Sequence, residues 1–582
     1  MKKLKQKIWK FIKSFCAILG GIVLIIGIGA VIVNLYNRGG VYVPDNSALT
    51  IDFSHHITEA EDDSLLSEIT EESSIKLSKI IQSIELAAHD NHIKALVARL
   101  DTTDLELAQV QDIARAVAYF RGHGKKAYVF SQGFGPLGQG NREYYLATFF
   151  DKIYMQPHTT IGLTGIAIEV PFVRSLLDKL GIEPEFFARY EYKTAMMSLT
   201  DKNMSASYRK DMNNLAQGLS DVLISGIEQN RQLKEVKKLV NQAPFSAEKG
   251  VELGLIDGIM YLPELEKNLQ KENVENYIAV EDYAQAIKTH EGDLPVIAYL
   301  TLSGVIDKGE SSNELDGEIV IGSRSVASDI AEIADLPNLK AIIVRIDSPG
   351  GDYNASDEIY NALKNLKIEK HIPIIISMSG YAASGGYYIA LAGDKIIAEP
   401  TTITGSIGVL GGKVSLQQMW QKIGVNWAEI KIGQNADILS VNKPFSAEEK
   451  RLFNASLDEI YDDFTQKVVE NRHLKRNIND IARGRVWLGW QAFEVGLVDM
   501  MGGYAEAIES ARKAAGLSED AKFILAEYPR SKTFSEKISE LLLAGQVKER
   551  KLLMHSGVDI RYLKLFKQLQ YDTVLPAFMI KM

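Results

Sequence analysis

A serine and a lysine that lie far apart in the chain are the residues best suited to do chemistry together. Ser384 lies in residues 380–386, whose sequence is GYAASGG, between an apolar run and a helical pattern. A serine at such a strand-to-helix junction sits at a helix N-terminus, where the helix dipole and free amides favour developing negative charge. An isolated ASGG is more often a helix-capping serine, so the nucleophile hypothesis depends on the rest of the chain.

A matching segment about 243 residues upstream carries the complementary residue types. Asn141 stands where that copy would have the serine, and Lys193 stands where the downstream copy has Ala436. A serine nucleophile needs a base, and a lysine can serve as one when burial lowers its pKa from about 10.4. Because one half has the nucleophile and the other half has the base, we predict that the two halves jointly build one serine–lysine site.

The duplication extends over most of the chain. Residues 94–101 (KALVARLD) match residues 340–347 (KAIIVRID), and the segment YYLA at 144–147 matches YYIA at 387–390. The offset between matching segments stays at roughly 241 to 246 residues, and their order never changes. Such internal repetition predicts two copies of one fold.

Apolar strands alternate with helical patterns in both copies, which is typical of an α/β fold whose strands are covered on both faces. We therefore expect two tandem α/β repeats preceded by a basic terminus and an apolar segment. The predicted boundaries are 1–13 for the N-terminus, 14–36 for a membrane anchor, 47–265 and 293–530 for the repeats, 266–292 for a polar linker between them, and 531–582 for a C-terminal tail.

The N-terminus predicts export and anchoring. Residues 1–13 contain six lysines, and residues 14–36 contain no charged residue. A helix of that length can cross the ~30 Å hydrocarbon core of a bilayer, and the lysines favour a cytoplasmic N-terminus. A cleaved signal peptide is the alternative, but the apolar run is long for one and no small-x-small cleavage site is evident. We expect an uncleaved transmembrane helix, with the repeats in the periplasm of a Gram-negative cell.

Composition and motifs argue against several other classes of protein. The formal net charge is −10 and no basic stripe is present, so nucleic acid is not an expected partner. Cys16 is the only cysteine, which excludes disulfides within the chain, cysteine-based zinc sites and iron–sulfur clusters. No HExxH motif is present, so a zinc protease of that type is excluded as well. We expect neither a metal nor a cofactor.

Two further motifs in the second repeat could support the serine. The turn DSPGG at 347–351 ends an apolar strand, and the first repeat has DTTD at the equivalent place. Paired glycines can turn backbone amides toward an oxyanion, so Gly350 and Gly351, together with Gly385, are the predicted oxyanion residues. Ser406, in TGSIG at 404–408, aligns with Leu163 and could orient a neutral lysine amine.

A glycine-rich loop in the first repeat offers a competing interpretation. Residues 133–138 (GFGPLG) match GxGxxG between a strand and a helix, the context of a dinucleotide site. However, Pro136 intrudes, residues 152–156 offer no acidic ligand for a ribose, and the loop aligns with the Ser384 loop of the other repeat. The sequence favours the serine–lysine interpretation over a nucleotide site.

Taken together, the DSPGG, GYAASGGY and TGSIG motifs and the duplicated order resemble the long form of the signal peptide peptidase A (protease IV) family, over almost the whole chain. The resemblance implies that Ser384 is the nucleophile and Lys193 the general base. It also implies a Clp protease/crotonase-like fold of stacked ββα units, a bowl-shaped homotetramer in the bacterial inner membrane, and hydrophobic cleaved signal peptides as substrates. The family often has Asn where this chain has Asp347.

Two alternatives from other classes stay open at this point. One is a membrane scaffold that keeps the fold without catalysis, which the intact Ser384 and Lys193 positions disfavour. The other is an acyl-CoA enzyme of the crotonase type, since a fold does not determine a function. An exported location without coenzyme A disfavours that class. Because both residues belong to one chain, we expect each site to be completed within a protomer.

Overall fold

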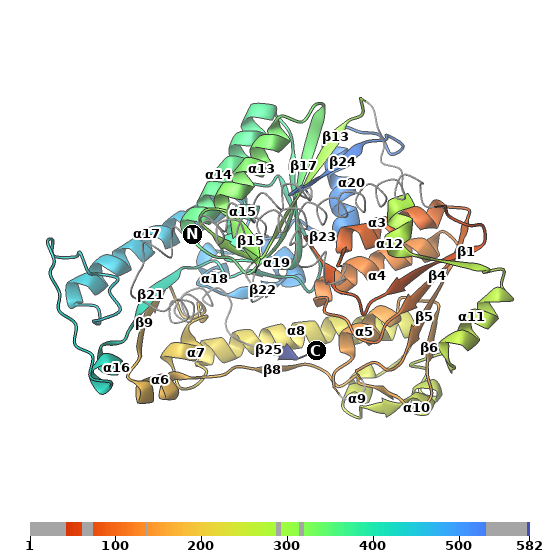
Figure 1. The fold of residues 1–582 in the computed structure, drawn as a ribbon, viewed down its shortest axis with the longest axis horizontal. Helices are drawn as coiled ribbons and strands as arrows, with labels where there is room; N and C mark the ends of the chain where they lie inside the picture. Colours follow the sequence, from red (N-terminus) through yellow and green to blue (C-terminus); the bar gives the residue numbers. More distant parts are fainter. Residues whose placement is uncertain are drawn as a thin grey trace, which may run out of the picture.

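The first repeat is built around one parallel sheet. The computed structural model describes residues 42–60, 74–135, 138–286, 293–313, 319–530 and 579–581. In the first sheet the strands are arranged in the order β11-β6-β5-β4-β1-β12, and every pairing in it is parallel. The central strands β1, β4, β5 and β6 are labelled in Figure 1. The strands are β1 (Ser47–Asp52), β4 (Ile93–Arg99), β5 (Lys126–Ser131), β6 (Lys152–Met155), β11 (Gly258–Ile259) and β12 (Asn276–Ala279).

The second repeat reproduces this arrangement. Strands β24, β13, β17, β18, β19 and β23 are neighbours in that order, as β12, β1, β4, β5, β6 and β11 are in the first sheet. The long central strands are apolar runs that are buried almost throughout, which confirms the expectation of strands covered on both faces. The strands are β13 (Val296–Ser303), β17 (Leu339–Ser348), β18 (Ile374–Ala383), β19 (Lys395–Ala398), β20 (Ile403–Gly405), β22 (Val486–Leu488), β23 (Met500–Met501) and β24 (Ile524–Tyr528).

The expected linker at 266–292 is wrong over the part that the structure describes. β12 lies within it and pairs in parallel with β1, with Ile278 opposite Leu49. α12 (Val280–Ala286) follows and buries Val280 and Tyr283 in the first core. The sequence pattern is weak there because a short edge strand buries few side chains. The first repeat therefore extends to residue 286.

The two repeats share a hydrophobic core. α3 (Leu77–His89) and α4 (Leu107–Gly122) cover the first sheet, and α20 (Tyr504–Ala514) of the second repeat packs against α4. Tyr504 and Ala507 of α20 belong to the same apolar cluster as Ile80 of α3. In the second repeat the equivalents of α3 and α4 are α13 (Ser323–Ala334) and α14 (Tyr353–Lys370). A shared core fixes the position of one repeat against the other.

Besides the shared core, the repeats contact each other through an extended arm from each repeat. These arms contain the two longest of the described helices, α8 (Ala206–Arg231) in the first repeat and α17 (Ala447–Asn471) in the second. Beside them, β9 (Glu183–Ala188) of the first repeat pairs antiparallel with β21 (Leu410–Ser415) of the second (Figure 1). The chain leaves β9 directly toward Lys193, so this pairing delivers the first repeat's lysine to the second repeat.

The predicted anchor at 14–36 lies outside the described residues, as does nearly all of the tail at 531–582. Within the part of the chain that the structure describes, no helix has the length and apolar character needed to span a bilayer.

A buried arginine, Arg345, forms ion pairs across the interface between the two repeats, which we call the seam. Arg345 of β17 is 1% exposed and donates to both carboxylate oxygens of Glu59 at 3.1 and 2.8 Å. It also donates to Asp112 of α4 at 2.6 Å and to the hydroxyls of Ser377 and Ser379 at 3.0 Å. Two carboxylates of the first repeat therefore depend on one guanidinium of the second.

We expect Arg345→Met to lower the free energy of unfolding by about 3–5 kcal/mol, because it leaves two buried carboxylates without a cation. Arg99 is the matched control, since it aligns with Arg345 but is 39% exposed and bonds Asp101 at 2.8 Å. Arg99→Met should cost less than about 1 kcal/mol. Urea unfolding of both variants measures the difference, and equal losses would show that the buried pairs do not hold the seam.

Candidate active site

Ser384 occupies the strand-to-helix junction that the sequence predicts. It follows β18 and precedes α15 (Gly385–Ala390), with backbone angles φ 55° and ψ −117°. Positive φ is uncommon for a residue other than glycine and occurs at strained functional turns. The Ser384 amide donates to the Gly405 carbonyl at 2.9 Å, which fixes the turn against β20. The junction thus directs the serine side chain out of the sheet edge.

Lys193 reaches the second repeat through a gap that glycines leave open. Its side chain is buried, and the preceding Tyr192 amide donates to the Arg483 carbonyl at 3.2 Å. A Cβ atom on Gly484 would lie 2.5 Å from the Lys193 Cβ, and one on Gly408 would lie 3.3 Å from its Cδ. A side chain at position 484 would therefore collide with the Lys193 backbone, and one at position 408 would crowd the lysine side chain.

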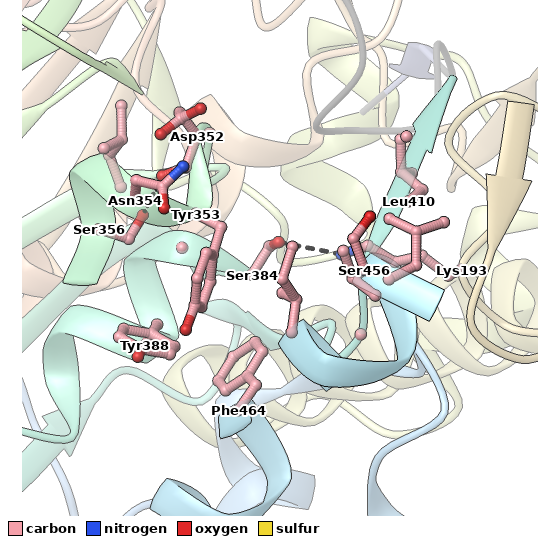
Figure 2. Close-up of a pocket in the computed structure, with 18 of the residues that line it drawn as sticks. Lys193, Asp352, Tyr353, Asn354, Ser356, Ser384, Tyr388, Leu410, Ser456 and Phe464 are labelled. Atoms are coloured by element: carbon pink, nitrogen blue, oxygen red, sulfur yellow. Dashed lines mark hydrogen bonds between the residues drawn. The ribbon is translucent and has the colours of Figure 1, made fainter. Parts of the chain in front are cut away.

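The structure brings Lys193, Ser384 and Ser406 into contact. Nζ of Lys193 lies 3.0 Å from Oγ of Ser384 and 2.9 Å from both the carbonyl oxygen and Oγ of Ser406; the contact with Ser384 is drawn as a dashed line (Figure 2). These partners are all neutral, and no carboxylate of the described residues forms an ion pair with Nζ. Burial therefore acts unopposed and lowers the pKa of Lys193 to about 7.

Ser406 is held in place by its own backbone. It adopts φ 48°, and its amide donates to the Arg485 carbonyl at 2.8 Å. The carbonyl and hydroxyl of this one residue are therefore both presented to the lysine amine. The equivalent Leu163 has no hydroxyl to present.

The three predicted oxyanion glycines differ in their environment. The Gly350 amide donates to Oγ of Ser348 at 3.1 Å and is therefore already engaged. The amide nitrogen of Gly351 lies 3.2 Å from where a Cβ atom on Gly385 would be, so the Gly351 and Gly385 backbones are close neighbours. Neither of these two amides has a hydrogen-bond partner among the described residues. Gly350, at φ 112°, contributes the turn, since a Cβ there would lie 2.8 Å from the Ser384 Cβ.

A groove of about 810 Å³, lined by both apolar and polar side chains, opens beside Ser384 and Lys193. Figure 2 shows Phe464 and Tyr388 on one side of Ser384 and Leu410 near Lys193. Sequence reasoning missed these groove residues. α17 does carry apolar residues at helical spacing, which is the signal that could have found this wall. The aliphatic and phenylalanine side chains that line it are Phe186, Val305, Ile306, Val409, Leu410, Phe453, Leu457, Ile460 and Phe464.

The first repeat has no equivalent site. Asn141, at the position of the serine, donates to the Gly165 carbonyl at 2.8 Å and accepts from the Gly165 amide at 3.0 Å. It is a buried structural residue that closes its own turn. In the glycine-rich loop, the Gly138 and Gly140 amides donate to the carbonyls of Gly135 and Gly162. These amides are not available to a phosphate, which argues against the dinucleotide interpretation.

Comparison with known proteins shows where the chain belongs. The model of peptidase family S49 matches residues 137–275 and 367–518, and the Clp protease model matches residues 322–404. "Serine protease SPPA, chloroplastic" of Arabidopsis thaliana is 30% identical over 477 residues, covering 79% of this chain and 69% of the relative. "Protease 4" of Haemophilus influenzae is 29% identical and covers 81% and 80%. "Putative signal peptide peptidase SppA" of Enterococcus faecium is 32% identical and covers 48% and 80%.

The fold and these relatives define a serine protease, a hydrolase that acts on peptide bonds, with a Clp protease-like α/β architecture. The chain belongs to peptidase family S49, and within that family it is of the Protease 4 type. The resemblance identified from the sequence motifs is thereby confirmed.

Proposed function

We propose that this protein is a membrane-anchored endopeptidase in which Ser384 and Lys193 form the catalytic dyad, and that it degrades cleaved signal peptides at the periplasmic face of the bacterial inner membrane. The observation that carries the proposal is the 3.0 Å contact between Nζ of Lys193 and Oγ of Ser384, made between two repeats that each lack the other's residue.

The geometry suits proton transfer by a neutral lysine. A neutral amine has two hydrogens and one lone pair, whereas Nζ has three oxygen neighbours. If both hydrogens go to Ser406, the lone pair faces the Ser384 hydroxyl. Lys193 then accepts the hydroxyl proton as Oγ attacks the peptide carbonyl, and the resulting ammonium donates that proton to the leaving amine. Water completes the hydrolysis of the acyl-enzyme by the reverse proton path.

The negative oxygen of the tetrahedral intermediate needs donors that are free before the reaction. The unpartnered amides of Gly351 and Gly385 lie next to Ser384 and fit that requirement. The turn at Gly350 and the N-terminus of α15 hold them in position. We therefore assign the oxyanion site to Gly351 and Gly385, with Gly350 as the residue that shapes the turn.

The apolar side chains along part of the groove support hydrophobic peptides as substrates. Signal peptides are released as apolar segments, and the groove offers Val409, Leu457, Ile460 and Phe464 beside the proposed nucleophile. The residues at 14–36 would anchor the enzyme in the bilayer that holds these segments. The relative of Enterococcus faecium carries the name of a putative signal peptide peptidase, which agrees with this substrate class.

Hydrolysis of a synthetic apolar signal peptide tests the substrate class. Ile460→Asp places a carboxylate in the groove wall and should lower kcat/KM for that peptide about 10–100-fold, because an apolar side chain cannot compensate a partly buried charge. The exposed neighbour Glu459 provides the control variant Glu459→Ala, which should change little. Labelling of Ser384 by a fluorophosphonate reports whether the dyad of each variant is intact. An Ile460→Asp enzyme that cleaves the apolar peptide normally would exclude the groove as its binding site.

Completion of the site within one chain predicts a negative complementation result. When Ser384→Ala and Lys193→Ala chains are co-expressed, activity should stay at background, since no chain then holds both groups 3.0 Å apart. Differential tags on the two chains, used in sequence, isolate the mixed particles. Recovered turnover in those particles would mean that serine and lysine come from different copies.

A further inference from the structure

One repeat docks on the other through a strand pair whose counterpart within the chain is missing. β21 of the second repeat pairs antiparallel with β9 of the first, from Leu410 opposite Ala188 to Ser415 opposite Glu183. The offset of 243 residues that relates Asn141 to Ser384 also relates α6 (Arg174–Leu180) to α16 (Gln417–Lys422) and Gly181 to Gly424. By the same offset, β21 corresponds to residues 167–172 and β9 corresponds to residues 426–431.

The counterpart of β9, residues 426–431, does not pair with another strand among the described residues. Residues 425–432, which we call the donor segment, form no helix or strand in this chain. Ile430 and Ile432 are 98% and 97% exposed, and Trp427 is 59% exposed. Isolated exposed apolar residues are common, but a run of such large side chains on one segment marks an interaction surface.

The counterpart of β21 is an edge that accepts an antiparallel strand. It begins with β8 (Ala167–Glu169), which pairs antiparallel with β25 (Met579–Lys581) from the end of the chain. Ile580 lies opposite Ile168, and Lys581 lies opposite Ala167. The strand from the C-terminus thus occupies the position on β8 that β9 occupies on β21.

The symmetry of the repeats determines where a partner for the donor segment must come from. Were the repeats related by a two-fold axis, both strand pairs would form within one chain. Only β9 with β21 does so among the described residues, and the donor segment remains exposed. The two repeats are therefore related head-to-tail. Applying the same relation between chains places the first repeat of one copy next to the second repeat of another copy.

We propose that the donor segment of one chain adds as an antiparallel strand to the β8 edge, residues 167–172, of a second copy of this chain, and that β25 competes for the same edge. The repeat fixes the register: Ile168 lies opposite Ile430, and Val170 lies opposite Ala428. Each copy has one donor and one acceptor, so the contact builds a ring or a filament of identical chains. This contact specifies how the expected homotetramer would be joined.

Cysteine cross-linking tests the register in the full-length chain. In a Cys16→Ser background, which removes the only native cysteine, the variant Ile168→Cys/Ile430→Cys places two thiols directly opposite each other, at a Cβ separation of about 5 Å. The control variant Val170→Cys/Ile432→Cys is displaced by four residues along the strand and exceeds the reach of a disulfide. We expect oxidation to convert the first variant, and not the second, into covalent oligomers on non-reducing gels.

Removing residues 579–582 tests the competition. The cross-linking yield of the Ile168→Cys/Ile430→Cys variant should rise several-fold when β25 is absent. Intermolecular disulfides in neither the full-length nor the shortened variant would overturn the proposed contact, provided that both retain fluorophosphonate labelling. Equal cross-linking of the displaced control would overturn the register, and an unchanged yield after shortening would overturn the competition.

The proposed register also makes an electrostatic prediction. Glu169 lies opposite Glu429, and like charges directly opposite each other destabilise a strand pair. Glu429→Lys should therefore increase the fraction of assembled protein in light scattering at low salt. Glu169→Lys/Glu429→Lys should remove that gain, because it restores a like-charge pair. No difference among these three proteins would contradict the pairing.

Discussion

Ser384→Ala is expected to abolish peptide hydrolysis, with a loss of about four to six orders of magnitude in kcat, because no other group can form the acyl-enzyme. The variant should fold normally, since only one oxygen atom is removed from a turn whose amide bond to Gly405 is kept. Hydrolysis of an apolar peptide and labelling by a fluorophosphonate should both be lost.

The repeat provides a matched control for this variant. Asn141 is at the equivalent position and makes two hydrogen bonds with Gly165. Asn141→Ala should cost about 1–3 kcal/mol of stability through the unsatisfied Gly165 groups, while activity at a temperature where the protein stays folded is retained. Equal loss of activity in both variants would place chemistry in both repeats, contrary to the asymmetric site.

Lys193→Met is expected to be inactive yet folded, and the wild-type enzyme should gain activity as the pH rises through about 7. Burial lowers the pKa of Lys193 to about 7, and only the neutral amine can accept the Ser384 proton. Below that pH the amine is protonated and kcat/KM falls about tenfold per pH unit. Methionine has similar length and no charge, so it removes the base without leaving a cavity. A methionine variant that keeps most of its activity would rule out the dyad.

Another buried group titrates in the same range and must be separated from the lysine. Burial, together with the nearby Glu59, raises the pKa of Asp347 to about 7. Its carboxylate accepts from the Tyr381 amide at 3.0 Å and so joins the end of β17 to the end of β18. Asp347→Asn keeps an acceptor oxygen there but cannot ionise. The pH midpoint of kcat/KM should be unchanged in this variant if Lys193 sets it, and a shifted midpoint would assign the profile to Asp347.

The sequence predicted the duplicated α/β fold and the residues at the centre of the site for one physical reason. Ser384 and Lys193 differ from their counterparts Asn141 and Ala436 while the surrounding frame is kept, so the comparison of the two repeats isolates them. Glycines and turns at 347–351 and 404–408 were found in the same way. Such differences mark candidate site residues, however far apart those residues lie in the chain.

Features that arise from contacts between distant segments could not be predicted in this way. The sequence predicts a linker where β12 lies, because four residues of a half-buried edge strand carry too little pattern. The pairing of β9 with β21, which brings Lys193 to Ser384, depends on two edges finding each other across the repeats. The groove combines side chains from β9, the Ser384 region and α17, so no single stretch of sequence contains it. The bonding of the Gly350 amide to Ser348 is likewise visible only in three dimensions.

The division of the site between the repeats links activity to an intact chain. Lys193 lies before the nucleophile by almost two hundred residues, and the serine's repeat has Ala436 at the place of a base. On the proposed roles, a nascent chain that has released only its first repeat cannot cleave a peptide, and neither can a fragment left after cutting between the repeats. On the same roles, hydrolysis requires that the second repeat has folded against the first, so that Nζ of Lys193 reaches Ser384. The duplicated architecture therefore keeps a partly synthesised chain inactive until both repeats have folded. No propeptide has to be removed to activate it.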